Sequence, residues 1–351
     1  GAAVAPNVAP ESTRLGVMLP STPLHHLLLE AVDAPLVATS GNLSDEPIAI
    51  DEREAVARLG SFAELFLVHD RPVERHADDS VGWLHGEELQ LLRRARGFAP
   101  LPVPVAVRLP PLLAVGAHLK NVVGLGRGSE VVLSQHVGDL ETPEALAAFE
   151  RVVADLLRLW EAEPVAIAHD LHPDYLSTRW ARRAAAGDES EGALPPALLR
   201  AAGEGRLRLV PVQHHHAHLA SCLAENEADG PALGVTWDGT GYGTDGTVWG
   251  GEFLDATRGS FERLGCFGPF RLPGGDAAVR HPLRIAAAVL GGAGLPVDRL
   301  LPELPAAEAG AVAEMLARNL NAPACSSLGR IFDAAAALLG LVRETDYEGE
   351  G

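Results

Sequence analysis

The sequence contains few cysteines, few basic residues and no long hydrophobic run. Its three cysteines, Cys222, Cys266 and Cys325, are widely spaced and odd in number. They form neither a disulfide framework nor a CxxC zinc motif. We therefore expect a reducing compartment, the cytoplasm.

Basic residues are scarce relative to acidic ones. The chain has 28 Lys and Arg against 47 Asp and Glu, for a formal net charge of −19. This balance excludes a protein whose whole surface binds nucleic acid, and we expect no nucleic-acid partner. A small basic site for phosphate remains open, with a candidate at Arg93, Arg94 and Arg96.

No apolar run reaches the ~18 residues that a bilayer-spanning helix needs. The first twenty residues also lack the basic start and apolar centre of a signal peptide. We therefore expect no membrane association. The first ten residues read instead like the interior of a longer gene product.

What the sequence does contain is an alternation of strand-like and helix-like segments over 351 residues, which predicts an α/β protein of two domains. The proline-rich stretch 97–111 is predicted to be an extended connector, because proline disfavours both helices and central strands. Before it we expect a buried strand at 35–39, a helix at 52–59 and a short strand at 65–68. After it we expect strands near 112–115, 122–126, 131–135 and 165–170, and helices at 143–161 and from about 177.

His214 and His218 are the first candidate for chemistry. They are four residues apart, so on a helix they share one face and can bind one metal ion. Asp238, at the end of a predicted strand, is the natural third ligand, and this donor set suits zinc or iron(II). His215 and His216 point elsewhere on the helix and could hydrogen-bond a substrate. A pair of this spacing is also common as a surface or packing feature.

A loop rich in Gly, Asp and Thr, residues 238–246, lies between two strand-like runs. It predicts a hairpin with a wide turn whose main chain can approach a phosphate closely. A plain hairpin loop is the alternative.

Two further segments are candidates for anion binding. The turn Thr39-Ser40-Gly41-Asn42 follows a predicted strand and, with Arg94, could form one anion pocket. Lys120 could also reach a phosphate, although an exposed lysine is the simpler interpretation.

Two other residues are interpreted as structural. Asp170 is better explained in this way when judged singly, and Cys222 is interpreted as a small buried residue.

At this point the motifs resemble a known family. LGVMLPSTPLHHLLL, TSGNLSDEPI, HADDSVGW and LLRRARGFAP resemble the second half of a YrdC-like domain. GAHLKNVVGL, SQHVGDLET, DLHPDYLST, VQHHHAHLAS, DGTGYGTDGTVWGGEF, LPGGDAAVRHPLRIA and SSLGRIFDA are similar to the first part of the carbamoyltransferase domain of the HypF family. The resemblance covers nearly the whole chain in the family's order.

The resemblance implies a partial YrdC-like α/β domain at 1–105, followed by a partial α/β domain of the actin/Hsp70-like (ASKHA) class at 112–351. It implies a carbamoyltransferase that matures [NiFe]-hydrogenase. Such an enzyme forms carbamoyl adenylate from carbamoyl phosphate and ATP, with Mg²⁺, and transfers the carbamoyl group to the C-terminal cysteine of a HypE-like partner for cyanide synthesis.

Carried onto this sequence, the resemblance assigns His214, His218 and Asp238 as metal ligands at the catalytic site. It places Gly239, Thr240, Gly241, Tyr242 and Gly243 against the adenylate with Lys120 nearby, and Thr39, Ser40, Asn42 and Arg94 in the first site.

The family's acylphosphatase-like domain, its paired CxxC zinc fingers and the first half of its YrdC-like domain are not found in this sequence. The end at YEGEG also leaves out a final acidic ligand, so both sites are expected to be incomplete. An antibiotic-type O-carbamoyltransferase shares both domain types in the opposite order. A non-catalytic nucleotide-binding fragment is the alternative from another class.

Overall fold

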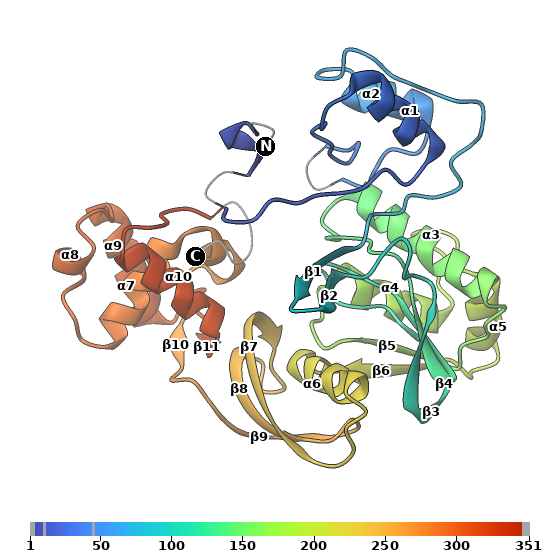
Figure 1. Ribbon diagram of the computed structural model, residues 1–351. Helices are drawn as coiled ribbons and strands as arrows, with labels where there is room; N and C mark the ends of the chain where they lie inside the picture. Colours follow the sequence, from blue (N-terminus) through green and yellow to red (C-terminus); the bar gives the residue numbers. More distant parts are fainter. Residues whose placement is uncertain (1–3, 10–11, 44–45, 346–351) are drawn as a thin grey trace. The chain divides into compact units, whose positions relative to one another are not determined.

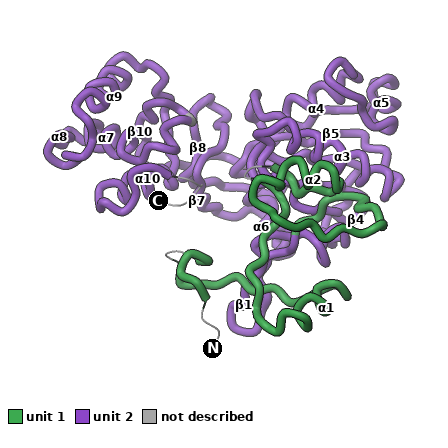
Figure 2. Tube along the Cα trace, turned by 90° about the horizontal axis from the view of Figure 1, so that it is seen from above, with its two compact units in different colours: residues 1–78 green, residues 79–351 purple. Residues whose placement is uncertain are grey.

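The computed structural model describes residues 4–9, 12–43 and 46–345. The chain forms two compact units, residues 1–78 and residues 79–351 (Figure 2). Both helices and strands are present, in agreement with the α/β class predicted above. Among the described residues, no helix combines the length and the apolar character that crossing a membrane requires.

The first unit is helical and buries little. It contains η1 (Pro6–Val8), α1 (Pro23–Val32) and α2 (Glu52–Leu59). The helix predicted at 52–59 is confirmed at both ends, and the Asp51 side chain caps its first turn by accepting two backbone N–H bonds. Among the described residues of this unit, only Leu59 and His76 are buried.

The strands predicted at 35–39 and 65–68 are wrong. Neither segment is a strand in the structure, and Val37 and Leu65 are 78% and 91% exposed. A strand needs a neighbour to complete its hydrogen bonds. The described part of this unit holds no strand that could pair with either segment. The apolar residues of the two segments therefore have the pattern of a strand but do not form one.

The second unit starts with the hairpin β1 (Val81–His85) and β2 (Glu88–Arg93). A mixed sheet of order β4-β3-β5-β6 follows, and three helices accompany it (Figure 1). Its strands are β3 (Pro102–Ala114), β4 (Gly124–Leu133), β5 (Ala166–Asp170) and β6 (Arg208–Val212). The helices are α3 (Pro143–Leu159), α4 (Leu176–Ala186) and α5 (Pro196–Gly203).

The main core lies between this sheet and its helices. Leu113, Leu125 and Val132 point from the sheet into one apolar cluster with Phe149 of α3 and Trp180 of α4. The Phe149 and Trp180 rings meet edge to face with centroids 5.3 Å apart. Neighbours of these strand residues point to the opposite face, as the two-residue period of a strand requires.

The connector predicted at 97–111 is wrong from Pro102 onward, because β3 begins there. β3 pairs with β4 along its length but with β5 only through Leu112–Ala114. The preceding part of β3 therefore has one unpaired edge, where proline is tolerated in a strand. The two strands predicted at 122–126 and 131–135 are one continuous strand, β4, in the structure.

A second sheet follows helix α6 (His214–Glu225), in the order β10-β11-β8-β7 with β9 also paired to β8. Its strands are β7 (Ala232–Tyr242), β8 (Val248–Ala256), β9 (Phe261–Cys266), β10 (Phe270–Arg271) and β11 (Ala324–Cys325). The accompanying helices are η2 (Gly275–Arg280), α7 (Pro282–Gly292), α8 (Val297–Leu300), α9 (Ala306–Arg318) and α10 (Leu328–Leu338).

Candidate functional site

Helix α6 presents two histidines on one face, as their spacing predicts. The Gln213 side chain caps the helix by accepting a hydrogen bond from the His216 N–H at 2.9 Å. One turn along the helix, the rings of His214 and His218 lie with centroids 4.9 Å apart and their Nε2 atoms 3.2 Å apart. The helix geometry therefore directs two ligand nitrogens to one point in space.

The neighbouring strand β7 brings Asp238 to the same point. Its Oδ2 lies 3.2 Å from His214 Nε2 and 3.5 Å from His218 Nε2, and one ligand atom of each residue lies within 4.8 Å of the others. Asp238 Oδ2 is buried without a hydrogen-bond partner. Two imidazoles and a carboxylate suit zinc or iron(II), so these residues fit a divalent ion. Their role as metal ligands stays a prediction.

The charges of this cluster favour a bound cation. Burial lowers the pKa of His214, but the contact with Asp170 and the negative charges of Asp170 and Asp238 outweigh burial and raise that pKa to about 9. Burial would raise the pKa of Asp238, yet its contacts with His214 and His218 hold it well below the ordinary value. The two carboxylates thus hold a positive charge at His214, which a metal ion can replace.

The other two histidines contact protein groups, and their expected contact with a substrate stays a prediction. His215 is fully buried, and burial lowers its pKa to about 4. Its Nδ1 accepts a hydrogen bond from the Gln213 amide at 3.1 Å, and its Nε2 lies 3.5 Å from Asp238 Oδ2. His216 Nε2 contacts the Thr257 carbonyl oxygen at 2.9 Å. Both side chains fix α6 against the second sheet.

The predicted hairpin is confirmed, but its turn is narrower than expected. Strands β7 and β8 pair up to Tyr242 and Val248, with a bulge between Trp237 and Gly241. Only residues 243–247 remain in the turn, and Gly243 N–H donates to the Thr247 carbonyl oxygen at 2.9 Å. Most of the predicted loop is therefore bulged strand.

Two glycines of this hairpin are explained by close packing. A Cβ atom on Gly241 would lie 2.5 Å from His215 Cε1, and one on Gly243 would lie 2.2 Å from Trp249 Nε1. Glycine at these positions lets α6 and Trp249 approach the main chain. Contact between Gly239, Thr240, Gly241, Tyr242 or Gly243 and a nucleotide stays a prediction.

A buried ionic network, which the sequence reasoning missed, supports the turn. Glu252 is fully buried on β8 and accepts from Arg263 Nε of β9 at 2.7 Å. Arg263 also reaches Asp245 in the turn at 3.1 Å and stacks 4.1 Å over the Trp249 ring. Glu252 further binds the hydroxyl of Ser326. A glutamate inside the apolar strand motif WGGEFL was the available signal.

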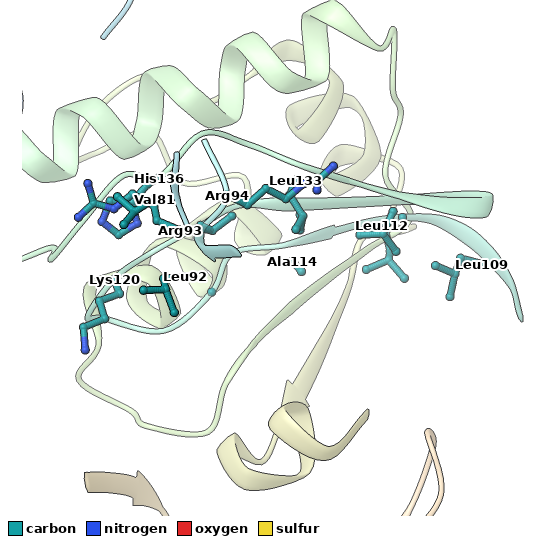
Figure 3. A pocket seen from close by; sticks show the side chains of 15 residues that line it. Val81, Leu92, Arg93, Arg94, Leu109, Leu112, Ala114, Lys120, Leu133 and His136 are labelled. Atoms are coloured by element: carbon teal, nitrogen blue, oxygen red, sulfur yellow. The ribbon is translucent and has the colours of Figure 1, made fainter. Parts of the chain in front are cut away.

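Arg94 and Lys120, which were predicted for different sites, line one pocket of about 740 Å³ in the second unit. Lys120 lies at one end of this pocket and Leu109 at the other (Figure 3). Arg94 donates to the carbonyl oxygens of Phe98 and Leu101 at 3.2 and 3.3 Å. The Lys120 main chain is held by Asp139 Oδ1 at 2.6 Å. The pocket wall is otherwise mainly apolar.

The remaining predicted residues lie in the first unit. Thr39 and Ser40 are exposed, and the Asn42 amide donates to the neighbouring Leu43 carbonyl oxygen at 2.8 Å. Arg94 belongs to the second unit, so an anion pocket formed jointly by these residues stays a prediction.

Comparison with known proteins adds three matched families. The family described as "Telomere recombination", which groups Sua5, YciO and YrdC, matches residues 1–95. The "HypF Kae1-like domain" matches 108–225, and the second subdomain of the "Carbamoyltransferase, Kae1-like Domain" matches 234–351. The predicted domain types are thereby confirmed, while the boundaries 1–105 and 112–351 stay predictions.

Among curated relatives, the chain is 40% identical to carbamoyltransferase HypF of Synechocystis sp., over 98% of this chain and 45% of that protein. It is 44% identical to carbamoyltransferase HypF2 of Cupriavidus necator, over 98% and 42%. The chain thus spans less than half the length of these two relatives.

The solved structures that resemble this chain are also HypF proteins. A full-length HypF in the phosphate- and nucleotide-bound form has a TM-score of 0.84 at 36% identity, covering 96% of this chain and 50% of that one. HypF of T. kodakarensis has a TM-score of 0.86 at 33% identity, covering 98% and 44%.

Proposed function

The chain belongs to the HypF family, and we propose that it forms part of a carbamoyltransferase that acts in the maturation of [NiFe]-hydrogenase. The proposed reaction converts carbamoyl phosphate, ATP and one water molecule to carbamoyl adenylate, pyrophosphate and phosphate: water releases phosphate from carbamoyl phosphate, and an oxygen of the resulting carbamate displaces pyrophosphate from the α-phosphorus of ATP. A cysteine thiolate at the C-terminus of a HypE-like partner then attacks the carbamoyl carbon, and the bond to the AMP oxygen breaks. The observation that carries this proposal is the convergence of His214, His218 and Asp238 in a chain of this family.

The residues of the cluster have defined tasks in this proposal. His214, His218 and Asp238 would hold a divalent ion, zinc or iron(II), which when bound polarises a carbonyl oxygen. His215 and the Gln213 amide hold α6 in a fixed position against β7, so the three ligand atoms keep their separation. Placing donors before the substrate arrives avoids reorganisation during the reaction.

The nucleotide is proposed to contact the β7–β8 hairpin. The network of Glu252, Arg263 and Asp245 fixes the turn, so that the backbone at residues 239–243 is presented in one conformation. Lys120 and Arg94 would supply positive charge, and the phosphate- and nucleotide-bound form of a HypF relative supports the presence of anion sites in such a protein. Mg²⁺ would accompany ATP. Thr39, Ser40 and Asn42 are proposed to serve the adenylating step.

The experiment supplies ATP and radiolabelled carbamoyl phosphate together, with a HypE-like acceptor that ends in cysteine. It follows AMP and label on the acceptor. HypF of Synechocystis sp. serves as the positive control because this chain spans only 45% of it. The proposal is supported if AMP forms only in the presence of carbamoyl phosphate and the label appears on the acceptor thiol. ADP in place of AMP would indicate a kinase or a chaperone-like ATPase and contradict it.

Variants connect the activity to the cluster. His214→Ala and Asp238→Ala should lower carbamoyl transfer at least about 100-fold, the scale seen when a group that stabilises the transition state is removed. His85→Ala, at an exposed histidine at the end of β1, is the matched control and should leave transfer unchanged. Turnover by the relative with none by this chain would identify the chain as a binding fragment.

Three free cysteines are consistent with the expected cytoplasmic location.

A further inference from the structure

Asp170 lies outside the three predicted ligands but contacts one of them. It is the last residue of β5 and is 8% exposed. Its Oδ2 lies 2.9 Å from His214 Nδ1, and its Oδ1 accepts the His172 N–H at 2.8 Å. The Thr178 hydroxyl donates to the Asp170 carbonyl oxygen at 3.0 Å. The His172 N–H thus orients the carboxylate, and helix α4 holds the main chain of Asp170.

This contact decides which nitrogen of His214 is free to bind a ligand. An ionised carboxylate only accepts hydrogen bonds, so the proton of the contact must sit on His214 Nδ1. When a metal ion replaces the second ring proton, the lone pair is on Nε2, which faces Asp238 Oδ2 at 3.2 Å and His218 Nε2 at 3.2 Å. Asp170 therefore turns the lone pair of His214 toward the cluster.

The two histidines of the cluster differ in this respect. The His214 side chain is 20% exposed and has a buried carboxylate behind it, whereas His218 is 60% exposed. In the described part of the chain, the carboxylate near His218 is Asp238, which faces the same Nε2 that would bind the ion. His214 is the ligand with a fixed ring, and His218 keeps its side-chain freedom.

We propose that Asp170 is a positioning residue that fixes the tautomer and ring orientation of His214 for binding of a divalent metal ion. The proposal rests on the metal site of the proposed function. A hydrogen bond from a carboxylate to the second nitrogen of a ligating imidazole holds the ring and increases its basicity, and loss of such a partner typically weakens metal binding 10–100-fold. Asp170 itself lies outside the group whose ligand atoms converge.

The test titrates chelator-treated protein with Zn²⁺ in competition with a chromophoric chelator, and with Co²⁺ to record the visible spectrum. Asp170→Asn keeps the size of the side chain and removes its charge. It should lower the Zn²⁺ affinity about 10–100-fold and change the Co²⁺ spectrum. Asp174→Asn is the matched control, because Asp174 is an exposed carboxylate four residues away, and it should match the wild type.

Wild-type affinity and spectrum in Asp170→Asn would overturn the proposal, provided that His214→Ala abolishes binding. A wild-type chain that binds neither ion would overturn both the metal site and the role of Asp170. Metal binding without carbamoyl transfer would contradict only the proposed function.

A second measurement needs no variant and therefore decides the question if Asp170→Asn fails to fold. Long-range ¹H–¹⁵N NMR spectra of Zn²⁺-loaded wild-type protein, labelled at histidine, report which ring nitrogen carries the proton. Protonated Nδ1 on His214 supports the proposal. A deprotonated or metal-bound Nδ1 contradicts it.

Discussion

At the residue scale, Cys222 and Cys325 occupy opposite surroundings. Cys222 is exposed on α6, so its predicted burial is wrong. Cys325 is buried, and burial raises the pKa of its thiol to about 11 despite a hydrogen bond from the Ser327 N–H. Since the thiolate is the reactive form, the two thiols should differ in reactivity.

We predict that iodoacetamide at pH 8 alkylates Cys222 in the native protein and leaves Cys325 unmodified. A pKa raised from the ordinary 9 to about 11 lowers the thiolate fraction about 100-fold at this pH, and burial restricts access as well. Mass spectrometry of the labelled peptides measures both rates. In urea, the control condition, the rates should become similar. Equal alkylation rates of Cys222 and Cys325 in the native protein would contradict the burial of Cys325.

The same shift predicts a dependence of stability on pH. The folded state disfavours the Cys325 thiolate, so between pH 9 and about 11 the unfolded chain loses a proton that the folded chain keeps. The stability contributed by this thiol is therefore present below pH 9 and is lost as the pH rises toward 11.

Spacing along the chain was enough to predict that His214 and His218 share a face, and the position of Asp238 at a strand end suggested its place beside them. The contact between Asp170 and His214 could not be predicted in this way, because 44 residues separate the two in sequence. Only the pairing of β5 with β6 brings the end of β5 to the start of α6.

At the element scale, the pair Glu252–Arg263 joins β8 to β9 through a buried charge. The Glu252 side chain is fully buried, while Arg263 is 25% exposed. Removing one partner of a buried pair leaves the other charge without compensation, which costs much more than losing a surface pair.

We predict that Arg263→Ala lowers the free energy of unfolding by about 3–5 kcal/mol. Arg318→Ala is the control, because the Arg318–Glu314 pair is 72% and 59% exposed and should contribute at most about 1 kcal/mol. Urea unfolding followed by circular dichroism measures both. Combining Arg263→Ala with Glu252→Gln should recover part of the loss, because it removes the uncompensated charge. Equal losses of unfolding free energy in the two arginine variants would contradict this prediction, because the charge of Glu252 would then not be left uncompensated in a buried site.

Helices were predicted better than strands for a physical reason. The helix at 143–161 is confirmed as α3, since its apolar positions and the Thr142 cap lie within one segment. Strand β3 depends on β4 for its pairing, so its prolines were misread as a connector. The sequence of a strand alone does not show which of its edges is paired.

At the scale of the whole molecule, the two units differ in internal burial. In the described residues of the first unit two side chains are buried, whereas the second unit holds three apolar clusters. Local opening is easiest where few apolar contacts must break.

We predict that amides of α1 exchange with deuterium at least about 100-fold faster than those of α4, as expected if local opening of α1 costs about 3 kcal/mol less. The two helices have similar lengths, 10 and 11 residues, but α1 has no buried residue and α4 has five. Hydrogen exchange with mass spectrometry on the intact chain measures both, with α3 as a protected reference. Equal protection of α1 and α4 would contradict the assigned burial of the first unit.

One side chain described above, the Gln213 amide, connects the two elements that carry the cluster. Its oxygen holds the first turn of α6, and its nitrogen donates both to His215 and to the Tyr242 carbonyl oxygen, the latter at 3.3 Å. A displacement of the hairpin would therefore be transmitted to the rotation of α6 about its axis. In the proposed function, metal affinity and nucleotide affinity are therefore expected to be thermodynamically linked through this amide, each ligand changing the affinity for the other by the same factor.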